Sequence, residues 1–70
     1  MNINDLQYKY DRDSDILGVK VNRDFEYFET VELEEGLLLD LDKNHNPTSL
    51  EIHDASIRFN LSKDYLHQLM

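Results

Sequence analysis

The fold is decided by one stretch of the sequence, YFETVELEEGLLLDLD, which spans residues 27–42. Residues 27–33 alternate apolar and polar side chains, as a half-buried β-strand does. A tight turn follows, in which Gly36 can adopt a positive φ. Residues 37–42 then place three leucines on one face of a second strand. The stretch predicts an antiparallel hairpin, and we expect its second strand to be central and covered on both sides near Leu38.

Three further segments have the pattern of strands. Residues 6–10 alternate in the same way, and residues 16–21 are rich in β-branched side chains. Gly18 lies inside the latter segment and indicates a bulge or a close backbone approach. Residues 48–52 form the last of five short strands, which turns rich in Asp and Asn separate. This succession predicts an antiparallel β-meander over about residues 6–53.

The C-terminal segment changes to helical spacing. Its apolar positions form one stripe of a short amphipathic helix: Leu61, Tyr65, Leu66 and Leu69. Asn60 or Ser62 is suited to cap this helix, and residues 54–59 are suited to a helical turn before it. We therefore expect a helical tail over about residues 54–69, packed on the sheet. Together with the strands it forms a single α+β domain over residues 1–70.

The composition limits the classes of protein to which this chain can belong. The 70 residues include no Cys, and 15 Asp and Glu stand against 7 Lys and Arg, which gives a net charge of −8. A domain this small has a marginal core, and without disulfides self-association or a partner is the usual aid, so we expect a homodimer or a bound partner. The negative charge argues against nucleic acid as a partner. The absence of Cys fits the reducing cytoplasm. Residues 1–5 lack the features of a signal peptide, and no apolar run is long enough to span a membrane.

Several segments also match a known pattern in order and spacing. They are Tyr10-Asp11, Asp13, Asp15 and Leu17, then Thr30-Val31-Glu32 and Gly36, then Leu38 to Asp42, and last Leu50-Glu51-Ile52 with Asp54-Ala55-Ser56. Over about residues 6–60 the chain resembles the small prokaryotic domain-of-unknown-function family 2283. The resemblance implies a compact, dimeric, β-rich domain without an established activity. It also implies an antitoxin-like role, since some members look like small partners encoded beside toxins.

The most unusual cluster is acidic. Five glutamates fall within ten residues, and no Lys or Arg lies among them. Such a run solvates the chain and protects a sheet edge, or it forms a docking face for a basic protein partner. Nearby aromatics add the composition of an interface, and parity predicts that Phe28 is exposed and that Tyr27 belongs to the core. The candidate partner-binding residues are Phe25, Glu26, Phe28, Glu29, Glu32, Glu34 and Glu35.

Two turns carry alternating oxygen side chains, similar to the start of a calcium-binding loop. Both depart from that pattern, because a calcium loop requires glycine at its sixth position. Counted from Asp11, the sixth position is Ile16, and counted from Asp42 it is Pro47. Ordinary turn chemistry explains both series. Weak binding of a divalent cation, calcium above all, is the alternative function. Its candidate ligands are Asp11, Asp13, Asp15, Asp40, Asp42 and Asn44.

The sequence contains no motif for catalysis. It has no Cys nucleophile, no glycine-rich phosphate loop and no serine in a nucleophile elbow. The three histidines lie in three different segments without the spacing of a zinc site. We therefore expect a non-enzymatic protein-binding module without a cofactor, whose partners are a second copy and a basic protein.

Overall fold

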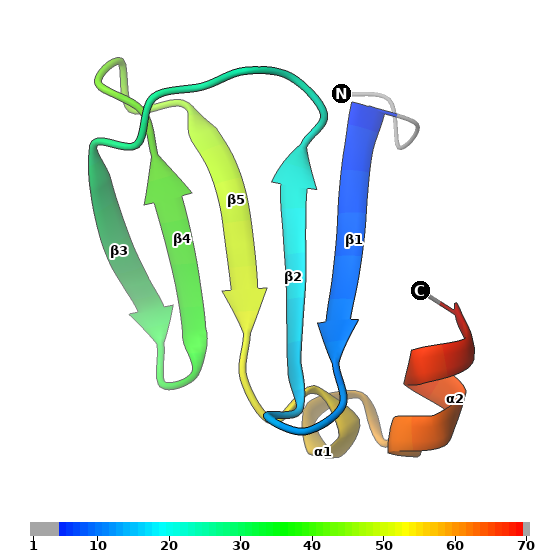
Figure 1. Cartoon of the computed structure of the whole chain (residues 1–70). Helices are drawn as coiled ribbons and strands as arrows, with labels where there is room; N and C mark the ends of the chain where they lie inside the picture. Colours follow the sequence, from blue (N-terminus) through cyan, green and yellow to red (C-terminus); the bar gives the residue numbers. More distant parts are fainter. Residues whose placement is uncertain (1–4, 70) are drawn as a thin grey trace.

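The computed structural model describes residues 5–69 and contains five strands followed by two short helices (Figure 1). In chain order these are β1 Leu6–Asp11, β2 Ile16–Val21, β3 Glu29–Glu34, β4 Leu37–Leu41, β5 Pro47–Ile52, α1 Ala55–Phe59 and α2 Lys63–Leu69. All neighbouring strands are antiparallel, which confirms the predicted α+β class. Residues 1–4, in which we expect no signal peptide, and residue 70 lie outside the described part.

The strand order is β1-β2-β5-β4-β3, which differs from the sequential meander that we predicted. β2 pairs with β5, and Leu17 stands opposite Ile52. The segment 22–28 crosses the end of the sheet from β2 to β3 (Figure 1), and the Phe28 N–H donates to the Leu41 carbonyl at 2.9 Å. Alternation along a strand specifies its buried face but not its neighbours. In the observed strand order, β1 and β3 are the two edge strands.

The sheet has one apolar face and one polar face. Directly opposed residues of antiparallel strands place their side chains on the same face. One row across all five strands is wholly apolar, and we call it the middle row: Tyr8, Val19, Leu50, Leu39 and Val31. A row on the opposite face is wholly polar: Gln7, Lys20, Ser49, Asp40 and Thr30. Alternation along each strand thus produces an amphipathic sheet.

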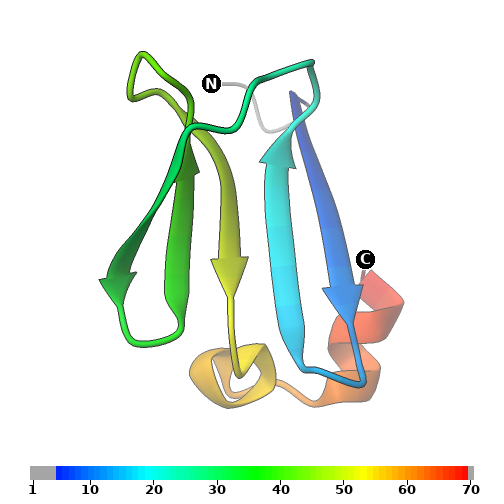
Figure 2. The ribbon, with the colours of Figure 1, turned by 60° about the vertical axis from the view of Figure 1, so that its left-hand side comes forward.

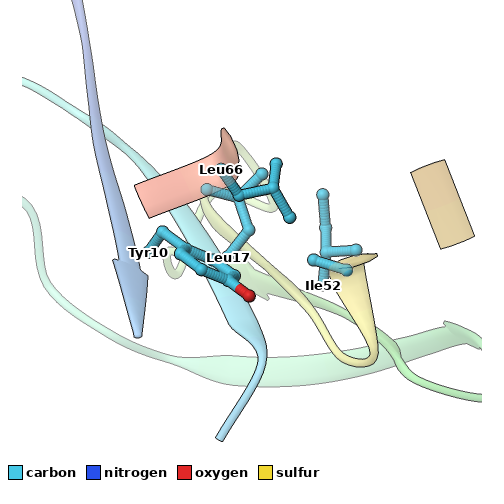
Figure 3. Close-up of a cluster of buried hydrophobic side chains, with 5 residues drawn as sticks. Tyr10, Leu17, Ile52 and Leu66 are labelled. Atoms are coloured by element: carbon cyan, nitrogen blue, oxygen red, sulfur yellow. The ribbon is translucent and has the colours of Figure 1, made fainter. Parts of the chain in front are cut away.

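The core lies at one end of the apolar face, where both helices are placed (Figures 1 and 2). Tyr10, Leu17 and Ile52 come from three adjacent strands and form one buried cluster with Ala55 and Leu66 (Figure 3). Leu66 is 2 % exposed, so α2 packs on the sheet as predicted. All residues of β4 are only half-buried, because this strand is second from the edge and the helices leave it largely bare. The prediction of a central, doubly covered strand is wrong.

The tail forms two short helices, in line with the predicted helical turn over residues 54–59 and the predicted helix after it. α1 ends at Asn60, which has a positive φ of 55° and donates its N–H back to carbonyls of the helix. Ser62 precedes α2 and caps it as predicted, since its hydroxyl accepts the Tyr65 N–H at 3.1 Å. Tyr65 and Leu69 are 49 % and 57 % exposed, so the predicted stripe is buried only at Leu66. Between residues 5 and 69 no helix is long and apolar enough to cross a membrane.

The two glycines differ in what their positions require. β2 runs through Gly18 in regular register, and a Cβ there would lie 3.7 Å from the Lys9 carbonyl oxygen, which is an ordinary contact. The predicted bulge or close approach at Gly18 is therefore absent. Gly36 has the expected positive φ, of 80°, in the turn between β3 and β4.

Candidate functional site

The seven predicted partner-binding residues lie together at one edge of the sheet. Three of them, Glu29, Glu32 and Glu34, are in the edge strand β3. The others flank it: Phe25, Glu26 and Phe28 precede the strand, and Glu35 follows it. We call these seven residues the β3 surface. All are exposed except Glu29, which is half-buried.

The aromatic side chains of this region point outward. Phe28 is 57 % exposed, which confirms the prediction, and its ring centroid lies 6.5 Å from that of His45. Phe25 is also exposed. Tyr27 is 63 % exposed, so its predicted place in the core is wrong. It precedes the regular part of β3, and its hydroxyl lies 2.8 Å from the Thr30 hydroxyl, at the surface of the sheet.

β3 presents different chemistry on its two faces. Glu29 and Val31 stand opposite β4 leucines of the apolar face, whereas Glu32 belongs to the polar face. A register shift between Glu32 and Glu34 accompanies the bulge that carries the exposed Leu33. The strand therefore offers both acidic and apolar side chains at the edge.

Arg58 engages two neighbouring glutamates, Glu34 through its carboxylate and Glu35 through its backbone carbonyl. Arg58 of α1 donates from Nη1 to Glu34 Oε1 at 3.0 Å and from Nη2 to the Glu35 carbonyl at 2.8 Å. This contact ties α1 to the turn between β3 and β4.

Glu26 and Glu32 take part in none of the ion pairs found between residues 5 and 69. The Glu35 carboxylate is also absent from these ion pairs, whereas a Glu29 oxygen lies 3.9 Å from His45 Nε2. Glu26, Glu32 and Glu35 therefore carry the least compensated charges of the β3 surface.

The carboxylates of the two acidic turns organise the turns themselves. Asp11 Oδ1 accepts the backbone N–H two residues later at 3.0 Å. Hydrogen bonds, above all from the Ser14 hydroxyl, hold the pKa of Asp11 below its usual value. Asp42 Oδ1 accepts the N–H groups of Asn44 and Asn46 at 2.9 and 3.0 Å, and these bonds, led by that from Asn46, lower the pKa of Asp42. This is the turn chemistry expected of Asp before Asn.

The candidate cation ligands do not converge. Asp40 accepts the hydroxyls of Thr30 and Ser49, both at 2.6 Å, on the polar face. Asp15 points into the core, while Asp13 is exposed. Among residues 5–69, no group of three or more His, Asp or Glu side chains is placed to hold a metal ion. Cation binding stays a prediction.

A buried polar cluster, which sequence reasoning missed, surrounds Asp15. This residue is 6 % exposed and has a positive φ of 58°. Its carboxylate accepts the Tyr10 hydroxyl at 2.6 Å, the Ser56 hydroxyl at 2.6 Å and the Ser56 N–H at 3.0 Å. Its carbonyl accepts the Ala55 N–H at 3.0 Å. We call Tyr10, Asp15 and Ser56 the Asp15 clasp, because they fasten α1 to the turn between β1 and β2.

The electrostatics of the clasp favour a charged Asp15. Burial raises the pKa of its carboxyl, but the hydrogen bonds from Ser56 and Tyr10 together outweigh burial and bring the pKa below its usual value. Burial and the neighbouring carboxylate raise the pKa of Tyr10 to about 12. Both hydroxyls are thus committed to one carboxylate, so the cluster is structural. All three residues are among those that carry the resemblance, but no local pattern in the sequence indicates that they contact one another.

A family model described as Protein of unknown function (DUF2283) matches residues 7–56, which is more than half of the 70-residue chain. The chain belongs to the DUF2283 family. No curated protein and no solved structure matches it. The segment matched to DUF2283 includes the whole β3 surface and ends at Ser56 of the Asp15 clasp, whereas α2 lies beyond it.

Proposed function

We propose that this member of the DUF2283 family is a non-enzymatic protein-interaction module of the cytoplasm, and that its β3 surface binds a basic segment of a partner protein. The position of β3 at the edge of the sheet is the observation that carries this function. An edge strand has a row of backbone N–H and C=O groups that the sheet leaves unpaired. An extended segment of a partner can pair with this row as an additional strand.

The charge of the β3 surface selects the kind of partner. No Lys or Arg occurs between Arg23 and Lys43, and the carboxylates of Glu26 and Glu32 have no counter-charge among residues 5–69. Charged side chains on an edge strand repel an identical edge, which disfavours pairing of β3 with β3 of a second copy. The same charges attract a basic segment and accelerate its association.

The exposed aromatics supply the apolar part of the contact. Phe28 lies directly before β3 and Phe25 lies in the segment that leads to it, and their exposed rings offer contact area beside the acidic side chains. Aromatic side chains are enriched in the energetically important part of protein interfaces. An antitoxin-like neutraliser of a basic toxin is the narrowest form of this function, and it rests on the family resemblance.

Affinity capture from a lysate of the native host tests this function when two variants of equal charge are compared. The first carries Glu26→Gln, Glu29→Gln and Glu32→Gln, and it leaves Glu34 and Glu35 to hold Arg58. The control carries Asp5→Asn, Asp13→Asn and Asp54→Asn, three exposed carboxylates outside the β3 surface. Mass spectrometry identifies the chains retained by each protein.

We expect one basic protein to be retained by the wild-type chain and by the control, and to be lost from the β3 variant. Equal retention by both variants would place the interface elsewhere. Retention of no basic protein by the wild-type chain would contradict the proposed function.

A further inference from the structure

The middle row is apolar across all five strands, yet none of its five residues is buried. Tyr8 and Val31 are exposed, while Val19, Leu39 and Leu50 are half-buried. The neighbouring row, which lies at the helix-bearing end, is buried at Tyr10, Leu17 and Ile52. Both helices lie at one end of the sheet (Figures 1 and 2), and the middle row is not buried.

The dimensions of the chain also show that it is less compact than a typical monomer of its length. Its extents are 36 × 27 × 19 Å, so the molecule is a thin slab. Its radius of gyration is 12.6 Å, whereas a compact chain of this length is expected near ~11 Å. It exposes 5234 Å², whereas a compact monomer of this mass is expected to expose ~4,600 Å². The excess approaches the ~800 Å² that one partner buries in a standard interface.

A second unpartnered apolar surface lies on α2. Tyr65 and Leu69 follow each other along the helix beside the buried Leu66, and both are exposed. Leu66 packs into the core cluster of the apolar face, and Tyr65 and Leu69 lie one residue before it and three residues after it, on the neighbouring side of the helix. The chain thus has an apolar middle row that is not buried and an exposed apolar stripe on α2, although Val21 and Thr48 are buried at the far end of the same face. Domains ordinarily bury such apolar surfaces between two layers.

We propose that a second copy of the chain covers the apolar face, related by a twofold axis that runs across the strands. Such an axis reverses the strand direction, so the α2 of each copy lies over the middle row of the other. The contact is isologous, and each copy both supplies a helical stripe and receives one. Two chains of net charge −8 approach best where charge is absent, and the middle row contains none.

Two neighbouring residues of β1 provide a matched test, because Tyr8 belongs to the apolar face and Gln7 to the polar face. Tyr8→Glu and Gln7→Glu add the same charge at exposed positions of one strand. Sedimentation equilibrium of the full chain measures the dimer dissociation constant for both variants and the wild type. We expect the wild type and Gln7→Glu to be dimers. For Tyr8→Glu we expect a dimer dissociation constant at least ~100-fold higher, because the symmetric interface would bury one added carboxylate from each copy.

A wild-type chain that stays monomeric would overturn the proposal and leave the apolar face to a different protein. Equal dissociation constants for the two variants would also overturn it. Circular dichroism measures whether the Tyr8→Glu variant retains the sheet. If it unfolds, isotope-filtered nuclear Overhauser effects in a mixed-label wild-type dimer decide the question. Contacts between Tyr65 or Leu69 of one copy and the middle row of the other are expected, and their absence in a dimer would contradict this geometry.

Discussion

The Asp15 carboxylate accepts hydrogen bonds from both the backbone N–H and the hydroxyl of Ser56, which lies 41 residues later in the chain. This pair joins the first turn of the sheet to the first turn of α1. Asp54, the residue at the N-cap position of α1, makes no side-chain hydrogen bond to the helix. Asp15 therefore satisfies from a distance an N–H group that a local cap would ordinarily satisfy.

Removal of the Asp15 carboxylate should be strongly destabilising. Asp15→Ala leaves the Tyr10 and Ser56 hydroxyls buried without their acceptor, so we expect a loss of ~2–4 kcal/mol in the free energy of unfolding. Ser56→Ala removes one donor and should cost ~1–2 kcal/mol. Urea unfolding at fixed protein concentration measures both. The exposed Asp13→Ala is the control and should change stability by less than ~0.5 kcal/mol. Equal losses for Asp15→Ala and Asp13→Ala would disprove the clasp.

Stability should fall in acid partly because of Asp15. Its folded-state pKa lies below the ordinary value, so its contribution is present above the unfolded pKa of ~3.9 and is lost as the pH falls through the lower folded pKa. Asp15→Asn should therefore show a shallower loss of unfolding free energy below about pH 4 than the wild type. Asp11 and Asp42, whose pKa values are also lowered, contribute equally in both proteins. Parallel acid curves would show that Asp15 does not titrate as described.

The two glycines should respond in opposite ways to alanine. At Gly36 a side chain meets a positive φ of 80° and lies 3.4 Å from both His53 Cβ and Arg58 Nη2. Gly36→Ala should therefore lower the free energy of unfolding by ~1–3 kcal/mol. Gly18→Ala places a Cβ in ordinary contact and reduces backbone freedom of the unfolded chain, so it should be neutral or stabilising by up to ~1 kcal/mol. Thermal denaturation of the pair checks this order, and a reversed order would contradict it.

Self-association through the apolar face predicts an unusual response to salt. Two chains of net charge −8 repel one another, while the middle row that joins them is uncharged. Added sodium chloride screens the repulsion, so the dimer dissociation constant should decrease between ~0.01 and ~0.5 M salt. Sedimentation at several salt concentrations measures this trend. An increase of the dissociation constant with salt would indicate an interface held by ion pairs.

The strands could be predicted from the sequence because each one alternates apolar and polar residues or is rich in β-branched or apolar residues, and turns bound them. The turn at Gly36, the cap at Ser62 and the exposure of Phe28 followed from equally local rules. The order of the strands did not, because pairing of β2 with β5 depends on a connection, residues 22–28, that carries no periodic signal. Local patterns define elements, while neighbours are chosen by the packing of the whole chain.

The candidate site was predicted only in part, because local patterns indicate some of its residues but not the contacts between residues far apart in the chain. The glutamates of the β3 surface form a visible run, so their common location was accessible from the sequence. The contact of Arg58 with Glu34 joins residues 24 positions apart and had no local signal. The Asp15 clasp was hidden in a turn whose alternating aspartates suggested a cation loop. Its distinguishing feature is the inward direction of Asp15, which only the three-dimensional packing with α1 provides.

Amide hydrogen exchange tests the central claim, that β3 is the binding edge, most directly. The measurement compares the free chain with its complex with the captured basic protein, residue by residue. If the partner adds as a strand, amides of β3 that exchange freely at the open edge should become protected, while amides of β1, the opposite edge strand, should not change. Protection confined to β1 or to the middle row, with β3 unchanged, would contradict the account.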